Sequence, residues 1–224
     1  MVQANLEILL GHHRCCPDKP NYQAKQIIFS PGDASDCLYY LHYGRVKLYY
    51  ITPNGQHLTL DLLGPEQWFG KAGWIAAIPD MLHAEAMSEV CVCSADRRLI
   101  EQAFEEEPTL VKALLEPLNQ RQQAMTTRLV EMFFADVPTR LAQALLMAGK
   151  NWGQNGNDGI KVIITHLDLA RLVGSTRETT TVCLHHLAHL GIIETQYRAI
   201  YIKNHERLLA LANQDLTLES VSMN

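Results

Sequence analysis

The sequence predicts an α+β protein with three parts: an N-terminal antiparallel β-roll, a long helix, and a C-terminal domain of mixed helices and strands. Three observations support this class. Short β-rich runs with turn signals fill residues 26–94, an apolar seam with alternating spacings of four and three follows Pro108, and a strand, two helices and a hairpin follow near the C-terminus. We therefore expect domains at residues 1–107, 108–135 and 136–224.

The composition is that of a folded globular chain, because 47% of the 224 residues are hydrophobic and 19% are charged. No apolar run approaches the ~18 residues needed to cross a bilayer. The N-terminus has neither a basic segment nor a small-residue cleavage site. These observations predict a cytoplasmic protein with no membrane contact. Its six cysteines stand at uneven positions in a chain of this size, unlike a disulfide framework, and we expect them to be reduced thiols.

The net charge of −5 is concentrated in the first part of the chain. Residues 1–107 contain 8 Lys and Arg against 14 Asp and Glu, whereas residues 136–224 contain 8 of each. A nucleic-acid partner therefore has to be argued from motif and geometry and not from charge.

The β-rich runs of the first domain are IIF, CLYYLHY, RVKLYYI, LTLDLL and VCVCSA. Turn signals separate them, notably SPGD at residues 30–33 and TPNGQ at residues 52–56, whose Asn-Gly pair suits a tight hairpin. Many short strands at close spacing predict an antiparallel roll similar to a cupin jelly roll.

The second part is a helix that begins near Pro108, after an acidic run. Pro117 is expected to kink or divide this helix. Its apolar or long side chains recur with heptad spacing, at Val111, Leu115, Leu118, Gln122, Met125, Leu129 and Met132. This seam predicts the dimer interface of a two-chain coiled coil; the alternative is a helix packed only on its own roll.

The third part begins with an amphipathic helix, DVPTRLAQALLMAGK, and a surface loop, NWGQNGNDG. A strand (IKVIIT), a helix (HLDLARLVG), a second helix to about Leu190 and a hairpin with its turn near Tyr197 and Arg198 follow. This order of elements is that of a winged helix-turn-helix, a DNA-binding motif.

The stretch VGSTRETTTV, residues 173–182, joins the two helices of this motif. Gly174 permits a tight turn, and Ser175 to Glu178 has the pattern of a capping box. At about 100° per residue, one face of the second helix collects Thr180, Cys183, Leu184, Leu187 and Leu190, and the other collects Arg177, Glu178, Thr181, Val182 and His185.

The second of these faces is the predicted DNA-binding surface. Arg177 can bond guanine and Glu178 can accept from cytosine, while threonines suit phosphate contacts. The predicted DNA-binding residues are Ser175, Arg177, Glu178, Thr179, Thr181 and Val182. The alternative is that Glu178 only caps the helix and that its neighbours are ordinary surface residues.

Several segments together resemble the cyclic-AMP receptor protein and fumarate-nitrate regulator (CRP/FNR) family of bacterial transcription factors. They are SPGD, GRVKLYYITPNGQ, LGPEQWFG, DVPTRLAQALL and VGSTRETTTVCLHHLAHLGII, so the resemblance runs from end to end. It implies a homodimer, a small-molecule or redox sensor in the roll, a palindromic double-stranded DNA site and contact with RNA polymerase. Many members carry a second Arg where this chain has Val182, which cannot bond guanine. The resemblance therefore predicts an altered half-site.

The sensor region departs from the family's cyclic-AMP site, in which a Gly-Glu pair and a later Arg-Ser pair hold ribose and phosphate. Here Lys71 replaces the Glu, and Asp80 and Met81 stand in place of Arg and Ser. These changes argue against cyclic AMP, whose phosphate needs the full set of donors.

The Gly-Lys pair is similar to the halophenol-sensing branch of the family. We expect an anionic or aromatic effector beside Lys71, against an apolar wall that includes Trp68, Phe69 and Trp74. The predicted effector contacts are Phe69, Gly70, Lys71, Ala72, Trp74, Met125 and Thr126. The alternative is that Lys71 is a surface charge and the aromatic residues are core.

The cysteine spacing does not favour an iron–sulfur cluster, because Cys15 and Cys16 are adjacent and Cys37, Cys91 and Cys93 are distant. We expect Cys91, Cys93 and Cys183 to be packing residues. Redox or metal sensing through HHRCC at residues 12–16 stays open, and a thiol switch there predicts oxidative loss of DNA binding that Cys15→Ser abolishes.

A cupin-type metalloenzyme is the remaining alternative. Such a site needs two or three His and a carboxylate at strand spacing, but His42, His57 and His83 are isolated. The sequence also has no phosphate loop, nucleophile elbow or His-Glu-x-x-His helix. We therefore expect no catalytic residues and no metal ligands.

Overall fold

The computed structural model describes residues 21–33, 37–70, 81–156 and 158–213. The chain divides into two compact units, which are described separately. The first comprises residues 1–56 and 60–125, and the second residues 57–59 and 126–224, so that one long helix contributes to both. No helix in the described ranges is long and apolar enough to span a membrane.

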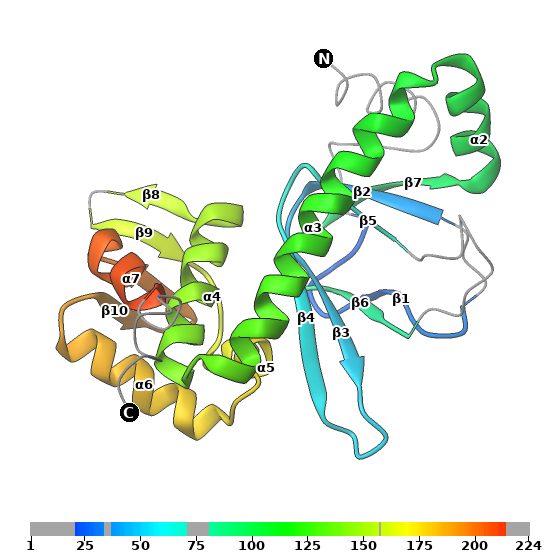
Figure 1. Cartoon of the computed structure of the whole chain (residues 1–224). Helices are drawn as coiled ribbons and strands as arrows, with labels where there is room; N and C mark the ends of the chain where they lie inside the picture. The colour runs from blue at the N-terminus through cyan, green and yellow to red at the C-terminus, as the bar shows by residue number, and fades with distance from the viewer. Residues whose placement is uncertain (1–20, 34–36, 71–80, 157, 214–224) are drawn as a thin grey trace, which may run out of the picture. The chain divides into compact units, whose positions relative to one another are not determined.

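The N-terminal part is a roll of two antiparallel sheets (Figure 1). One sheet has the order β1-β6-β3-β4 and the other the order β5-β2-β7. The predicted runs form β1 (Ile27–Phe29), β2 (Cys37–Tyr43), β3 (Val46–Ile51), β4 (His57–Leu63) and β7 (Cys91–Asp96). Two strands, β5 (Gln67–Gly70) and β6 (His83–Ala86), were not predicted from the sequence.

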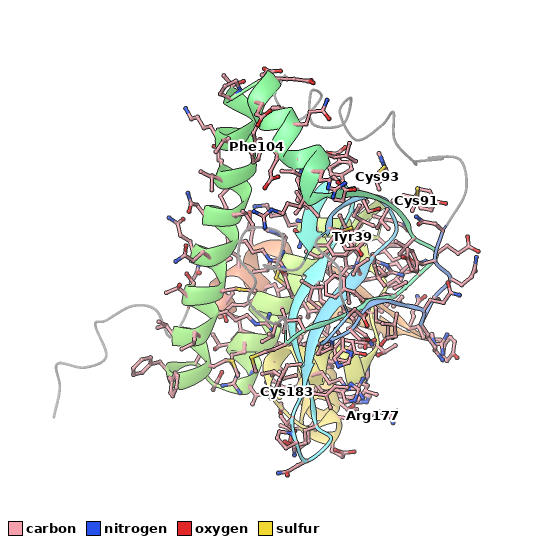
Figure 2. The ribbon with its side chains drawn as sticks, turned by 90° about the vertical axis from the view of Figure 1, so that its right-hand side faces the viewer. Tyr39, Cys91, Cys93, Phe104, Arg177 and Cys183 are labelled. Atoms are coloured by element: carbon pink, nitrogen blue, oxygen red, sulfur yellow. The ribbon has the colours of Figure 1, made fainter. Side chains whose placement is uncertain are left out.

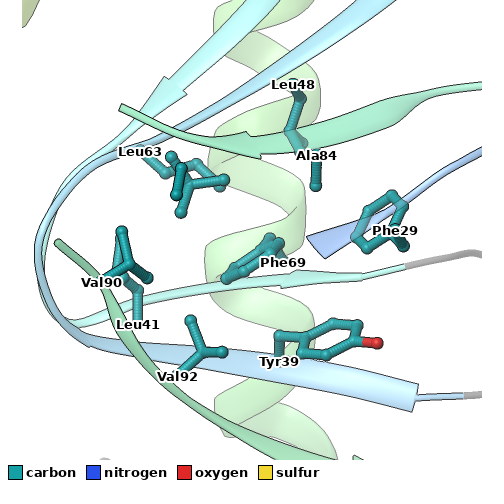
Figure 3. Close-up of a cluster of buried hydrophobic side chains, with 11 residues drawn as sticks. Phe29, Tyr39, Leu41, Leu48, Leu63, Phe69, Ala84, Val90 and Val92 are labelled. Carbon is teal, nitrogen blue, oxygen red and sulfur yellow. The ribbon is translucent and has the colours of Figure 1, made fainter. Parts of the chain in front are cut away.

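The two sheets enclose an apolar cluster in the interior of the roll (Figure 3). Phe29, Tyr39 and Phe69 stack there, with ring centroids 5.3–6.3 Å apart. Aliphatic side chains from both sheets complete the cluster, including Leu41, Leu48, Leu63, Val90 and Val92. The outer face of the β5-β2-β7 sheet has a second cluster, which contains Leu38, Tyr40, Trp68, Cys93 and Ala95.

Trp68 and Phe69 therefore lie in different clusters, because successive side chains of a strand point to opposite faces. The expectation that they share one apolar wall is wrong. Trp68 packs on Tyr40, with ring centroids 4.7 Å apart, whereas Phe69 packs inside the roll.

Two helices follow the roll. Helix α2 (Arg97–Glu106) begins at Asp96, whose carboxylate accepts a hydrogen bond from the Leu99 amide, and it packs Ile100 and Ala103 on the outer cluster. Helix α3 runs from Thr109 to Phe134. The expectation that Pro117 divides this helix is wrong, because the loss of one backbone donor does not interrupt 26 residues of helix.

The second unit contains α4 (Val137–Trp152), β8 (Gln154–Gly156), β9 (Gly159–Val162), α5 (His166–Val173), α6 (Arg177–His189), β10 (Ile193–Gln196), β11 (Ala199–Ile202) and α7 (His205–Ala212). The strands form one sheet of order β10-β11-β9-β8. Its core joins the buried faces of the helices to this sheet through Leu141, Leu145, Leu169, Leu184, Leu187 and Ile200.

This unit confirms the predicted winged helix-turn-helix order and adds to it. The stretch predicted as the loop NWGQNGNDG includes β8, which pairs with β9 from Gln154 to Gly156. Helix α7 was not predicted; it packs against α4 and buries Leu208 and Ala212. The hairpin turn lies where it was expected, at Tyr197 and Arg198.

Candidate nucleic-acid interface and sensor region

The turn between α5 and α6 has the geometry that the sequence predicts, but the cap lies one residue later. Gly174 ends α5 in the left-handed region, with φ 64° and ψ 45°. Thr176, not Ser175, is the N-cap of α6, and its hydroxyl accepts a hydrogen bond of 3.1 Å from the Thr179 amide. The capping box predicted at Ser175 and Glu178 is therefore wrong, because helical geometry begins only at Arg177.

Helix α6 separates a buried face from an exposed one. Thr180, Leu184 and Leu187 are at most 2% exposed, while Arg177, Glu178 and Val182 are exposed. Val182, an apolar side chain on the exposed face, is 68% exposed. Leu190, predicted on the buried face, is 42% exposed, because the helix ends before it.

The exposed face of α6 carries charged and hydrogen-bonding side chains. Figure 2 shows Arg177 among the side chains of this unit. His166 Nδ1 lies 3.0 Å from the Thr181 hydroxyl, and burial lowers the pKa of His166, with smaller contributions from His185 and Arg177. The face therefore combines donors from Arg177 and His185 with the Glu178 carboxylate.

The tip of the β10-β11 wing is a feature that sequence reasoning did not select. Tyr197 is 88% exposed, and the Arg198 guanidinium lies 5.3 Å from the centre of its ring. Arg198 has φ 56°, a left-handed conformation required by the two-residue turn. The predicted turn at Tyr197 and Arg198 could have pointed to this feature, because it places an aromatic residue and a cation at the end of an exposed hairpin.

The predicted dimer seam lies along α3 as a partly exposed apolar stripe. Val111, Leu115, Met125, Leu129 and Met132 are 37–59% exposed, and Gln122 is also exposed. Leu118 packs in part on the outer cluster of the roll. The helix is tied to β4 on another face, where Arg121 and Asp61 form a 2.7 Å ion pair.

The predicted effector contacts that the structure describes lie in different environments: some are buried in the roll and others are exposed on α3. Phe69 is 2% exposed inside the roll, and a Cβ on Gly70 would lie 2.8 Å from the carbonyl oxygen of Cys37. Met125 is 38% exposed on α3, and Thr126 is also exposed. The predicted contacts Lys71, Ala72 and Trp74 lie outside the described residues.

The roll also contains a charged pair that the sequence analysis did not consider. Lys47 on β3 and Glu85 on β6 form an ion pair of 2.9 Å, with side chains that are 10% and 17% exposed. Lys47 also lies over the Tyr49 ring, at 5.2 Å from its centre. The register of β3 and β6 pairs these two residues, which the sequence alone does not show.

The cysteines of β7 are buried, as expected for packing residues, since Cys91 and Cys93 are 1% and 2% exposed. Cys93 is disulfide-bonded, so the expectation that all six cysteines are reduced is wrong. Within the described ranges, no group of three or more His, Cys, Asp or Glu residues has the arrangement of a metal site. Cys15 and Cys16 lie outside those ranges.

An antiparallel sensor roll, a long helix and a winged helix-turn-helix with an exposed second helix define a DNA-binding transcription regulator. Two family models match the chain: the cyclic nucleotide-binding domain at residues 19–107 and the Crp-like helix-turn-helix domain at residues 139–211. The chain belongs to the CRP/FNR family of transcription regulators, and it is a regulator and not an enzyme.

Curated relatives cover most of the chain. A CRP-like cAMP-activated global transcriptional regulator of Mycobacterium tuberculosis is 30% identical over 183 residues, which are 81% of this chain and 82% of that protein. A global nitrogen regulator of Synechocystis is 29% identical over 87% of this chain and 88% of that one. Among solved structures, a CRP/FNR transcriptional regulator from Thermus thermophilus is 26% identical, with a TM-score of 0.75 over 87% of this chain and 97% of that one.

Proposed function

We propose that the chain acts as a homodimer that binds a palindromic DNA site, with one α6 in the major groove of each half-site, under the control of a small effector in the roll. The observation that carries this proposal is the two-faced character of α6. Its buried face fixes the helix on the domain core, and its first two turns present Arg177, Glu178 and Val182 to the solvent.

Each predicted DNA-binding residue has a chemical role in the proposal. Arg177 donates to guanine O6 and N7, and Glu178 accepts from a cytosine amine. Val182 contacts a thymine methyl. Ser175, Thr179 and Thr181 lie near phosphates, together with the amides at the start of the helix.

The test of base reading is selection of sites from a randomised duplex library with the natural protein, with Val182→Arg and with Arg177→Ala. We expect Val182→Arg to change the preferred base pair at one position, since it replaces an apolar contact by a guanine donor. Arg177→Ala should cost about 1–3 kcal/mol and relax preference at its position.

Arg98→Ala is the matched control, because it removes the same charge from an exposed position on α2. It should leave the selected site unchanged. Identical sites for the natural protein and both α6 variants would refute base reading by this helix.

The dimer part of the proposal rests on the seam along α3. An exposed stripe of aliphatic side chains with heptad spacing would be buried by the same stripe of a second copy. Such an interface would set the two α6 helices about 34 Å apart, one turn of DNA. Contact with RNA polymerase belongs to the proposal as a property that the family implies.

Leu129→Glu tests this interface, because Leu129 is 59% exposed in the seam and two carboxylates would face each other across a two-fold axis. We expect the dimer dissociation constant, measured by sedimentation equilibrium, to rise at least about tenfold. Gln120→Glu is the control, since its side chain is exposed on the opposite side of the same helix. Equal effects of the two substitutions would contradict the seam.

The proposed effector is a small anionic or aromatic molecule that contacts Phe69, Gly70, Lys71, Ala72, Trp74, Met125 and Thr126. The relative named as cAMP-activated belongs to the same family. In this chain, however, Lys71, Asp80 and Met81 stand where the family resemblance places the residues that hold ribose and phosphate in a cyclic-AMP site. A titration of natural protein and Lys71→Ala with phenols and aromatic acids tests the proposal, and the absence of a saturable shift in both would refute it.

A further inference from the structure

The C-terminal half of α6 carries two exposed histidines that the proposed base contacts do not use. His185 and His189 stand four residues apart in a helix that runs from Arg177 to His189. At about 100° per residue, such positions differ by about 40° around the helix axis. The two imidazoles therefore project from one face of α6, one above the other.

Histidines with this spacing can share one metal ion. Their Cβ atoms lie about 5–6 Å apart on a helix, so a nitrogen of each ring can reach an ion at the usual ~2.0–2.1 Å. The same spacing supplies two zinc ligands in the His-Glu-x-x-His helices of metalloproteases. Here His186 stands in place of the Glu of that motif, so the pair has ligands for a metal but no general base for catalysis.

The end of α6 is held in place, which keeps this pair in register. The Leu190 amide donates to the His186 carbonyl at 3.1 Å, so helical bonding continues past His189. The Arg207 guanidinium donates to the Leu190 carbonyl at 2.9 Å and fastens the end of the helix to α7. A metal ion would therefore meet two ligands whose backbone positions are already set.

The surroundings leave most of the coordination sphere open. His166 does not complete the site, since its Nδ1 lies 3.0 Å from the Thr181 hydroxyl. Within the described ranges, no group of three or more His, Cys, Asp or Glu residues could hold a metal. Zinc in proteins is usually four-coordinate, so a pair of histidines leaves positions for water or another oxygen ligand.

The pair lies on the same face as the proposed base contacts. At a rise of about 1.5 Å per residue, His185 lies about 12 Å along the helix axis from Arg177, and His189 about 18 Å. A recognition helix places its N-terminal residues against base edges, so in the proposed complex the far end of this face would lie nearer the DNA backbone. Residues 136–224 have 8 Lys and Arg against 8 Asp and Glu, so a bound cation would add positive charge to a domain with none in excess.

We propose that His185 and His189 bind a divalent transition-metal ion that prefers nitrogen ligands, such as Zn²⁺, and that a DNA phosphate oxygen replaces one of its waters in the complex. Imidazole suits zinc, copper and nickel. The metal site stands on α6 alone, whereas the phosphate contact rests on the proposed function. The proposal departs from the sequence-based expectation of no metal ligands, which was argued from the isolated histidines of the roll.

The metal site is tested without DNA, by hydrogen exchange of full-length protein with and without Zn²⁺ in a phosphine-reduced buffer. An ion that binds only the helical form slows exchange by the factor 1 + [Zn²⁺]/Kd, so amides in the last two turns of α6 should slow up to about 100-fold at 100 times Kd. Because the readout is the α6 peptide, metal bound elsewhere on the chain does not enter it. Unchanged exchange in these turns would overturn the proposal.

His185→Gln and His189→Gln should each abolish the slowing, because each leaves one ligand. His186→Gln is the matched control: it removes an equally exposed histidine of the same helix, about 100° around the axis from His185. It should retain the slowing. Equal slowing in His185→Gln and the natural protein, or a loss in His186→Gln alone, would overturn the assignment of the ligands.

The phosphate contact is tested by fluorescence anisotropy with duplex DNA at several salt concentrations, with and without Zn²⁺. One more neutralised phosphate should steepen the slope of log K against log[salt] by about 0.9. We expect this change in the natural protein and in His186→Gln, but not in His185→Gln. Slowed exchange with an unchanged slope would overturn the phosphate contact. A protein that binds no DNA would refute the proposed function, while the exchange result would still decide the metal site.

Discussion

Two neighbouring threonines of α6 should respond in opposite directions to the same substitution. The Thr180 side chain is fully buried, and its hydroxyl has no hydrogen-bond partner among the described residues. The Thr181 hydroxyl lies 3.0 Å from His166 Nδ1, and its side chain is half-buried. Valine has nearly the shape of threonine, so each substitution changes mainly one hydroxyl.

The expected magnitude follows from the cost of burying an unpaired hydroxyl, which protein data place at about 1–3 kcal/mol. Thr180→Val removes this cost and should raise the free energy of unfolding by about 1–2 kcal/mol. Thr181→Val removes a hydrogen bond and should lower it by about 1 kcal/mol. Helix propensity contributes little, because valine and threonine rank together.

The assay is urea unfolding in reducing buffer, followed by far-UV circular dichroism, with hydrogen exchange of α6 peptides assigning the change to the second unit. Thr180→Val should raise the midpoint with an unchanged slope, and its DNA affinity should stay the same because Thr180 faces the core. A loss of stability in Thr180→Val would refute the argument, since it would mean that the hydroxyl is paired in solution.

Three further predictions concern stability. Gly70→Ala should destabilise the roll by about 1–3 kcal/mol, because its methyl group would overlap the Cys37 carbonyl; thermal unfolding measures this, and a neutral result would contradict the close approach. Asp136→Ala should lower the free energy of unfolding by about 0.5–2 kcal/mol in the same assay, because it removes the N-cap of α4. Asp136→Asn should retain most of this stability, since asparagine also caps helices. His166 has a lowered pKa in the folded state, so the folded protein binds fewer protons than the unfolded one between that pKa and the ordinary value of 6.5. Stability should therefore fall as the pH drops below 6.5, and a His166→Gln variant with the same pH dependence would contradict this.

Local sequence patterns predicted most of the helices and strands, because each of these has its own cap, turn or hydrophobic period. Asp136 and Thr165 cap helices that the sequence pattern indicated, and the Asn-Gly turn lies between β3 and β4. The missed strands lacked such a signal. β6 reads HAEA, with small residues that pack only because β1 and β3 lie on either side of it.

The exposed residues of α6 could be predicted from the sequence, because they depend on one helix. Contacts that depend on the pairing of strands could not. The faces of α6 follow from helical period, so Arg177 and Leu184 were assigned correctly from sequence. The separation of Trp68 from Phe69, the Lys47–Glu85 pair and the contact of His42 with Cys93 all depend on which strands meet and in which register. Sequence spacing does not carry that information.

The neutral charge of the second unit bears on how it would discriminate between sites. Lys203 is paired with Asp158 and Glu194, at 3.6 and 3.4 Å, and Arg207 donates to the Leu190 carbonyl. These cations are partly compensated within the protein. Affinity for DNA of any sequence grows with the number of phosphates neutralised, so a domain with no net positive charge gains less from the DNA backbone than a basic domain would.

In the proposed complex, the base contacts of Arg177 would then carry a larger share of the binding energy than they would in a basic domain. Contacts to base edges contribute only at the correct sequence, whereas phosphate contacts contribute everywhere. Weak phosphate binding therefore lowers the affinity for non-specific DNA, and it raises the ratio of specific to non-specific affinity for the same base contacts. On this reasoning the lack of a net positive charge does not oppose DNA binding, because it would limit occupation of the wrong sites while the proposed α6 contacts select the right one.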